Sequence, residues 1–257
     1  MGGYAQLHLI TDRKRCPGDL MAAVRRALHG GTDWLQVRDK AAPVSDVYSL
    51  AREAMAACRE AGAGVIINDR LDVALAVGAA GVHLAKKSLP VAVARQLAAP
   101  GQLVGCSVHS LEEAVAAVRA GADYVTFGNV FATASHPDAP PKGLIALSRI
   151  VLAVDAPVLA VGGITLENLS DVLGTGCAGV AVIGAILAAP DPGAAAAAFR
   201  TILNEARVRP RRLLPTSLPQ PAPGRDGAAS PDLSRRGHES LSVPEGFSTP
   251  KTGKRGA

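Results

Sequence analysis

Eight short runs rich in β-branched residues alternate with longer segments whose apolar residues recur three and four positions apart. The runs lie at 7–11, 34–38, 65–68, 81–84, 103–107, 124–128, 157–163 and 179–184. They are nearly continuous in apolar residues, as expected of parallel strands buried on both faces. Several helical segments end at glycine, as C-terminal caps do: Gly30, Gly31, Gly62, Gly78 and Gly121. This alternation restricts the chain to α/β folds built on a parallel sheet.

Eight strand–helix units within about 200 residues match a closed (β/α)8 barrel at the compact end of its size range. The competing fold is an open, doubly wound sheet, which usually has fewer strands and a glycine-rich nucleotide fingerprint after the first one. Here Thr11, Asp12 and Arg13 follow the 7–11 run, without that fingerprint. We therefore predict an α/β fold of the (β/α)8 TIM barrel type over residues 1–206.

Residues 207–257 differ in composition from the rest of the chain. They hold eight of the 18 prolines, with Ser, Gly and Arg between them, and the alternation stops there. Too little apolar surface remains to offset the entropy of ordering this segment, so we predict a disordered C-terminal tail. The tail also carries the basic charge: ten Lys and Arg stand against four Asp and Glu. The barrel is close to neutral, and we expect no nucleic-acid partner.

The four cysteines are scattered and form no CxxC pair, which is typical of a reduced, cytoplasmic protein. No run reaches the roughly 18 apolar residues of a membrane span. The N-terminus shows no charged leader followed by a long apolar run. We therefore expect a cytoplasmic protein without a membrane partner. The sequence leaves the oligomeric state open, a homo-oligomer included.

Polar residues gather where the predicted strands end, which is where barrels of this type place their chemistry. Gln36, Arg38 and Lys40 alternate along one side of the 34–38 run, toward the barrel mouth. Two cations and an amide there favour an anion site, such as one for phosphate. The alternative is a rim of salt bridges, for which Asp39 is an available partner.

Further polar positions follow three other runs. Asn68 and Asp69 end the 65–68 run, and the spacing favours Asp69 as a helix cap over a metal ligand or a partner of a cation. Gly162 and Gly163 end the 157–163 run, and Ile183 and Gly184 end the last one. Backbone N–H groups and helix starts at these ends suit a phosphate. The alternative is a tight turn that needs no ligand.

Two histidines are candidates for the mouth. The loop after the 124–128 run holds Thr133, Ser135 and His136, and loops of this length often cover a ligand, although His136 could equally be solvated. The stretch GCSVHSLEE places His109 before a helix whose start carries a capping box of its own, Ser110 and Glu113. With an ordinary pKa of about 6.5, a histidine accepts and releases protons at neutral pH.

Seven motifs, in this order, resemble the thiamin phosphate synthase and thiazole tautomerase (TenI-type) family: LHLITD, LQVRDK, VIINDR, GVHL, GCSVHS, DYVTFGNVFAT and VLAVGGI. The resemblance covers residues 7–188 and implies a (β/α)8 barrel that acts in thiamin biosynthesis. For the synthase branch it implies that hydroxymethylpyrimidine pyrophosphate is joined to thiazole phosphate, with Mg²⁺ on the pyrophosphate.

The resemblance also implies roles for the matching residues of a synthase. Gln36, Arg38 and Lys40 would bind the pyrimidine pyrophosphate, and Asn68 and Asp69 would lie beside the metal. Ser107 would lie near the reacting groups. The thiazole phosphate would be bound by Gly162 or Gly163 together with Ile183 and Gly184.

Two positions depart from the synthase pattern. The motif GVHLGQxD, whose Asp lies on Mg²⁺, is GVHLAKKS here, so Ser88 replaces the carboxylate and Lys86 and Lys87 add positive charge. The T-x-T-K loop has no lysine here, since its last position is His136.

The tautomerase branch tolerates both changes, needs no metal and binds only the phosphorylated thiazole. Its signature SVHSLEEA is present at 107–114, and the resemblance implies that His109 is the acid/base group. A thiazole tautomerase without a cofactor is therefore the first hypothesis, a Mg²⁺-dependent synthase the second. A non-catalytic regulator that binds thiazole phosphate is the third.

Overall fold

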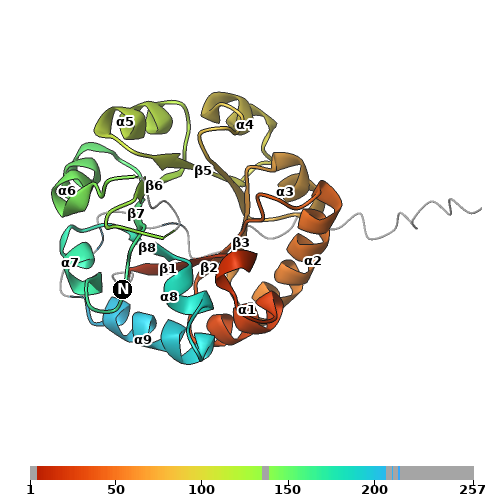
Figure 1. Ribbon diagram of the computed structural model, residues 1–257. Coiled ribbons are helices and arrows are strands. Elements are labelled where there is room, and N and C mark those ends of the chain that lie inside the picture. Colours follow the sequence, from red (N-terminus) through yellow and green to blue (C-terminus); the bar gives the residue numbers. More distant parts are fainter. Residues whose placement is uncertain (1–4, 135–138, 207–209, 211–213, 215–257) are drawn as a thin grey trace, which may run out of the picture. The chain divides into compact units, whose positions relative to one another are not determined.

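The computed structural model describes residues 5–134 and 139–206, together with Pro210 and Leu214. Within these ranges eight parallel strands close into a barrel in sequence order, with β1 hydrogen-bonded to both β2 and β8. Figure 1 shows the strands as an inner ring with the helices around it. The strands are β1 (Gln6–Ile10), β2 (Trp34–Val37), β3 (Gly64–Asn68), β4 (Gly81–Leu84), β5 (Leu103–Val108), β6 (Tyr124–Gly128), β7 (Val158–Val161) and β8 (Gly179–Val182).

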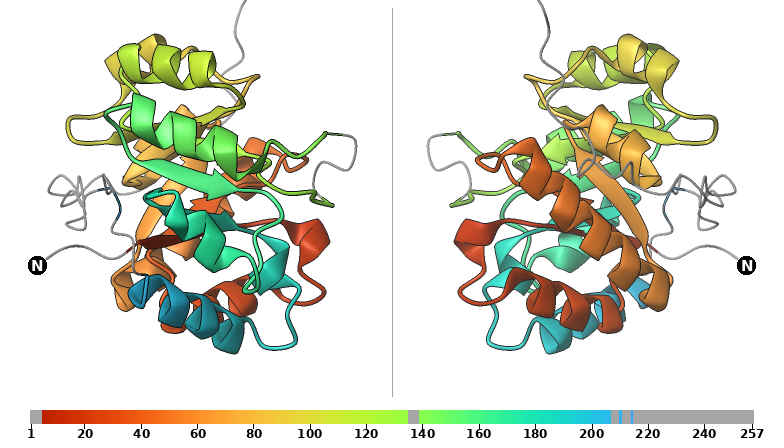
Figure 2. Two further views of the ribbon diagram at one scale, coloured as in Figure 1. Left: turned by 90° about the vertical axis from the view of Figure 1, so that its left-hand side faces the viewer. Right: turned by 90° about the vertical axis from the view of Figure 1, so that its right-hand side faces the viewer.

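The helices lie on the outer side of the strands in both side views of Figure 2. They are α1 (Leu20–His29), α2 (Val44–Ala61), α3 (Leu71–Val77), α4 (Val91–Leu97), α5 (Leu111–Arg119), α6 (Gly143–Ala153), α7 (Leu169–Gly174), α8 (Gly184–Leu187) and α9 (Pro192–Asn204), with a short 3-10 helix η1 (Arg13–Arg15). The predicted barrel is confirmed. So are the glycine ends: Gly31, Gly62, Gly78 and Gly121 all have positive φ angles, which glycine adopts without strain.

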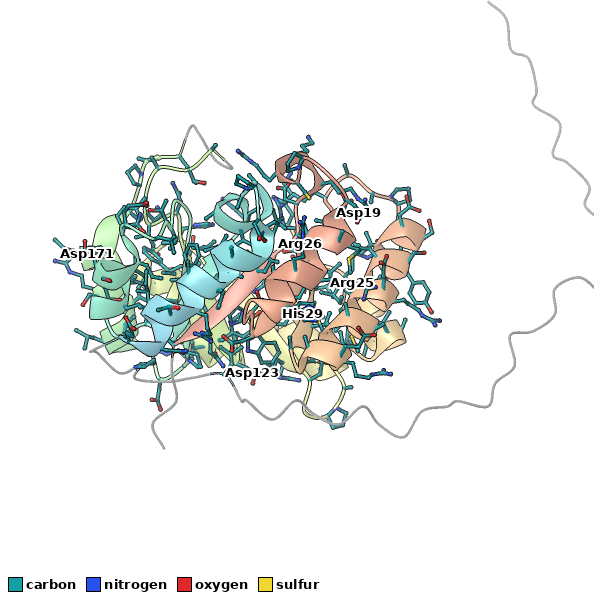
Figure 3. The ribbon with its side chains drawn as sticks, turned by 90° about the horizontal axis from the view of Figure 1, so that it is seen from below. Asp19, Arg25, Arg26, His29, Asp123 and Asp171 are labelled. Atoms are coloured by element: carbon teal, nitrogen blue, oxygen red, sulfur yellow. The ribbon has the colours of Figure 1, made fainter. Side chains whose placement is uncertain are left out.

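Between successive strands a helix returns the chain from the end of one strand to the start of the next. All βα loops therefore lie at one end of the barrel, called here the mouth, and the opposite end is the base. In Figure 3, Asp19, at the start of α1, lies toward the upper side of the barrel, and Asp123, before β6, lies toward the lower side. Among the described helices, none is both long and apolar enough to cross a membrane.

Two apolar clusters hold the barrel together. The larger one fills the space between the sheet and the helices. The smaller one contains inward-facing residues of five strands at the base, Trp34, Ile66, Leu103, Tyr124 and Leu159, together with Ala178 just before β8 and Leu214. A Cβ added at Gly105 would lie 2.1 Å from Cζ of Tyr124, so glycine at this position makes room for the tyrosine ring.

Leu214 belongs to the segment predicted to be disordered, and at this residue the structure departs from that prediction. The side chain is 2% exposed. Its backbone is bound by one side chain: Gln6 Nε2 donates to the Leu214 carbonyl, and the Leu214 N–H donates to Gln6 Oε1, both at 3.2 Å. The physical reason is that the apolar cluster at the base buries the Leu214 side chain, which the composition of the segment predicts to be exposed to solvent. The rest of the predicted tail, Pro210 excepted, lies outside the described residues.

Candidate active site

Arg38 follows β2 at the mouth, and its backbone is fixed by a buried threonine just after β1. Thr11 Oγ1 accepts from the Arg38 N–H at 2.7 Å and donates to the Arg38 carbonyl at 2.9 Å. The guanidinium donates to Asp12 at 3.1 Å. Asp39, the alternative partner in the sequence-based interpretation, is paired with Arg13 at 2.8 Å instead. The rim thus contains salt bridges and still presents Arg38 at the mouth, on the same side of β2 as Gln36.

Two consecutive side-chain hydrogen bonds connect β2 with β3. Gln36 Nε2 donates to Asn68 Oδ1 at 2.8 Å, and Asn68 Nδ2 donates to Asp69 Oδ2 at 2.6 Å. Asp69 has a φ of 62°, a left-handed conformation that is uncommon outside glycine. Residues predicted separately on two strands are therefore in direct contact.

The prediction that Asp69 caps the following helix is wrong. Helix α3 has Arg70 at its N-cap, without a capping side-chain hydrogen bond. The Asp69 carboxylate accepts instead from the Ala85 N–H, at 3.1 Å, and from the Ser88 hydroxyl, both in the loop after β4. Asp69 has a left-handed backbone conformation, and its carboxylate binds the loop after β4 instead of the start of α3.

Gly162 and Gly163, after β7, have φ angles of 94° and 66°. A Cβ on Gly162 would lie 2.5 Å from Cβ of Asn129, and one on Gly163 would lie 2.4 Å from the Ala132 carbonyl oxygen. The tight turn is therefore required by packing against the loop after β6. Among the described residues, the backbone N–H groups of Gly162, Gly163 and Gly184 donate no hydrogen bond to another group.

The end of β8 lies across the barrel from β4, and the end of β7 lies across from β3, because the strands close in sequence order. Ile183 precedes the short helix α8, which begins at Gly184, and both residues are half-buried. Of the predicted residues in the loop after β6, Thr133 is half-buried. Ser135 and His136 lie outside the described residues.

His109 is an exposed residue just after β5. Its Nδ1 lies 2.6 Å from the Gly128 carbonyl oxygen, so Nδ1 carries the proton and the neutral ring keeps Nε2 as an acceptor. The predicted helix cap is present: Ser110 Oγ accepts from the Glu113 N–H at 3.2 Å. The Glu113 carboxylate reaches the His109 N–H, at 2.6 Å.

His109 lines a groove of about 600 Å³ between α5 and α6. Phe127, Lys142, Ile145 and Arg149 also line this groove. Ser107, two residues earlier, makes its hydrogen bonds inside the barrel. The structure therefore shows no direct contact between these two residues of the predicted site.

Comparison with known proteins adds the family. Residues 7–186 match the family model described as thiamine monophosphate synthase. This chain belongs to that family. The thiamine-phosphate synthase of Roseiflexus castenholzii is 44% identical over 200 residues, which are 77% of this chain and 87% of that protein. The thiamine-phosphate synthase of Chlorobium luteolum is 45% identical over 202 residues, 78% of this chain and 94% of that protein.

A solved structure agrees with this assignment. The thiamine phosphate pyrophosphorylase of Pyrococcus furiosus is 42% identical, with a TM-score of 0.73, and the similarity covers 79% of this chain and 97% of that one. The resemblance inferred from seven motifs is thus confirmed at the level of the family. The names of these relatives favour the synthase hypothesis over the tautomerase hypothesis that came first.

In this family member, sequence reasoning missed a buried polar layer directly below the mouth. His83 Nε2 lies 2.8 Å from Ser107 Oγ and 3.3 Å from Thr126 Oγ1, and His83 Nδ1 lies 3.1 Å from the Tyr124 hydroxyl. Burial lowers the pKa of His83 to about 4, so the ring is neutral at pH 7. Strand alternation gave the signal, since His83, Ser107 and Thr126 all face inward.

Proposed function

We propose that this chain is a thiamin phosphate synthase, which joins hydroxymethylpyrimidine pyrophosphate to thiazole phosphate and releases pyrophosphate. The observation that carries the proposal is that two groups of residues suited to binding an anion lie at separate positions around the mouth. Arg38 and Lys40 follow β2, while the N–H groups of Gly162, Gly163 and Gly184 follow β7 and β8. Two positions suit two phosphorylated substrates, whereas a tautomerase binds one.

In this proposal each group has a separate task. Arg38 and Lys40 bind the pyrophosphate and stabilise the negative charge that grows on it as it leaves. Gln36 and Asn68, held by their mutual hydrogen bond, orient the pyrimidine. Ser107, fixed by neutral His83, lies below the position where the two rings meet. The glycine N–H groups bind the thiazole phosphate.

The proposal is tested by incubating the full chain with both substrates and following pyrophosphate release and thiamin phosphate formation. We expect the two products in equal amounts, with no release when either substrate is omitted. Absence of product at high enzyme concentration would contradict the proposal.

One observation favours tautomerase activity as the second candidate. His109 has its Nδ1 proton engaged by Gly128, which leaves Nε2 as a proton acceptor at the rim. NMR of the thiazole carboxylate phosphate would show a changing tautomer ratio, and His109→Asn would abolish the change. A constant ratio with the native chain excludes this activity, and binding of thiazole phosphate without either reaction would identify a regulator.

A further inference from the structure

The loop after β4 forms a turn that presents two lysines and is tied to Asp69. The Ser88 N–H donates to the Ala85 carbonyl at 2.9 Å, and the Ala85 N–H donates to Ser88 Oγ at 2.8 Å. The same Ser88 hydroxyl donates to the Asp69 carboxylate. Lys86 and Lys87 occupy the two central positions of this turn and are exposed. The turn, here called the lysine turn (residues 85–88), is thus held against the end of β3.

The lysine turn occupies acceptor positions that a metal ion would need. Asp69 Oδ1 accepts from Ala85 and from Ser88, which fills both lone pairs of that oxygen. Oδ2 accepts from Asn68, so one lone pair of the carboxylate remains. Residue 88, where the synthase pattern has a second carboxylate, is this serine. No group of three or more His, Cys, Asp or Glu suited to a metal occurs in the described part of the chain.

Electrostatics oppose a divalent cation at this place as well. Arg38, Lys40, Lys86 and Lys87 belong to this side of the mouth, against the carboxylates of Asp12 and Asp69. The pKa of Lys40 lies below its usual value, chiefly because of burial and then because of Arg38, with Lys87 as a smaller contributor. Mg²⁺ favours carboxylates together with phosphate oxygens, and neighbouring ammonium groups repel it. The residues present do not fit a Mg²⁺ site held by two carboxylates.

We propose that the lysine turn binds the diphosphate group directly, so that Lys86 and Lys87 supply the positive charge that a divalent cation supplies where residue 88 is an aspartate. Diphosphate binding by this chain is then independent of divalent metal. The inference rests on the proposed function for the identity of the ligand. Its physical basis is separate: a turn anchored by Ser88, one remaining lone pair on Asp69 and an excess of cations.

The experiment is isothermal titration calorimetry of the full chain with inorganic pyrophosphate, once in EDTA and once in Mg²⁺. Each Kd is calculated from the concentration of free pyrophosphate. We expect the two Kd values to agree within about threefold. A double variant, Lys86→Ala with Lys87→Ala, should bind about 10- to 100-fold more weakly in EDTA, as expected for the loss of charge-assisted contacts. The matched control removes two exposed cations from α2, Arg52→Ala with Arg59→Ala, and should bind as the native chain does.

A third variant asks whether residue 88 sets the metal dependence. Ser88→Asp should weaken binding in EDTA about tenfold, because a carboxylate is added beside the anion, and Mg²⁺ should restore the affinity. Thermal unfolding of each variant establishes that it is folded. The inference is overturned if the native chain binds pyrophosphate only with Mg²⁺, or if the double lysine variant binds as well as the native chain.

These outcomes are separable from those of the proposed function. If the chain binds pyrophosphate in EDTA through the lysine turn but forms no thiamin phosphate, the inference about the lysine turn holds and the synthase proposal fails. If the chain forms thiamin phosphate but binds pyrophosphate only with Mg²⁺, the synthase proposal holds and the inference about the lysine turn fails.

Discussion

The same eight strands build two opposite environments at the two ends of the barrel. Trp34, at the start of β2, lies in the apolar cluster at the base, and Arg38, just after the end of β2, lies at the mouth. On β5, Leu103 packs at the base and Ser107 binds His83 below the mouth. The base is closed by Leu214, whereas the mouth carries partly exposed cations and carboxylates. We infer that the base contributes chiefly to stability and the mouth chiefly to binding and catalysis.

The largest effect is expected at the base, from Tyr124→Ala. Tyr124 is completely buried between Gly105 and the inner cluster, so truncation leaves a large cavity. The free energy of unfolding should fall by about 3–5 kcal/mol in urea titrations. Tyr48→Ala, at an exposed tyrosine of α2, is the control and should change it by less than about 0.5 kcal/mol. Similar values for the two variants would remove the stabilising role of the base.

Leu214→Ala tests the closure of the base by the C-terminal segment. Loss of a buried leucine should lower the free energy of unfolding by about 1.5–3 kcal/mol. A chain that ends at residue 206 should lose a similar amount, and one that ends at residue 221 should lose none. Leu97→Ala, at a leucine that is 57% exposed, serves as the control. Full stability of the chain that ends at 206 would show that Leu214 does not close the base.

Arg38→Ala tests the mouth and should lower activity while leaving stability nearly unchanged. If the proposed synthase activity holds, loss of the charge-assisted contact to pyrophosphate should lower kcat/KM about 10- to 100-fold, about 1.5–3 kcal/mol. Stability should change by about 1 kcal/mol or less, since the lost pair with Asp12 is partly exposed. The control, Arg25→Ala, breaks exposed ion pairs between α1 and α2 and should leave turnover unchanged. Unaltered turnover in Arg38→Ala would contradict the role of the rim.

The last effect is gradual and concerns the pH dependence of the layer between the two ends. Burial lowers the pKa of His83 from 6.5 to about 4, so as the pH falls from 6.5 to 4 the unfolded chain takes up this proton first. Over that window His83 should lower the free energy of unfolding by about 1.4 kcal/mol per pH unit, and its contribution is fully present above pH 6.5.

His83→Gln should therefore flatten the dependence of stability on pH in this window. His29→Gln, at an exposed histidine of α1, should leave the slope as it is. An unchanged slope in His83→Gln would show that His83 titrates as an ordinary histidine.

Local rules in the sequence predict the strands, the helix ends and the contents of the rim. Continuous apolar runs identify the strands, and glycines with positive φ end several of the helices. Alternation along β2 places Gln36 and Arg38 on one side. The same alternation would have identified the layer of His83, Ser107 and Thr126. Each of these features is determined by residues close together in the sequence, so it can be predicted from the sequence alone.

Contacts between distant segments could not be predicted in this way. Asp69 binds Ser88, 19 residues away, through a left-handed backbone that no local propensity favours. Leu214 lies in a proline-rich segment without periodicity, 208 residues from its partner Gln6. The direction of the His109 ring depends on the Gly128 carbonyl of the next strand. Each of these contacts requires the closed barrel before the partners meet.

The central claim is that the mouth holds two phosphorylated groups at once, at two separate positions. It is tested most directly by titrating thiazole phosphate into the full chain already saturated with inorganic pyrophosphate, a pair that cannot react. We predict that thiazole phosphate still binds, one molecule per chain, with a Kd within about threefold of the value without pyrophosphate. Competition between the two ligands would mean a single shared phosphate position and would contradict the account.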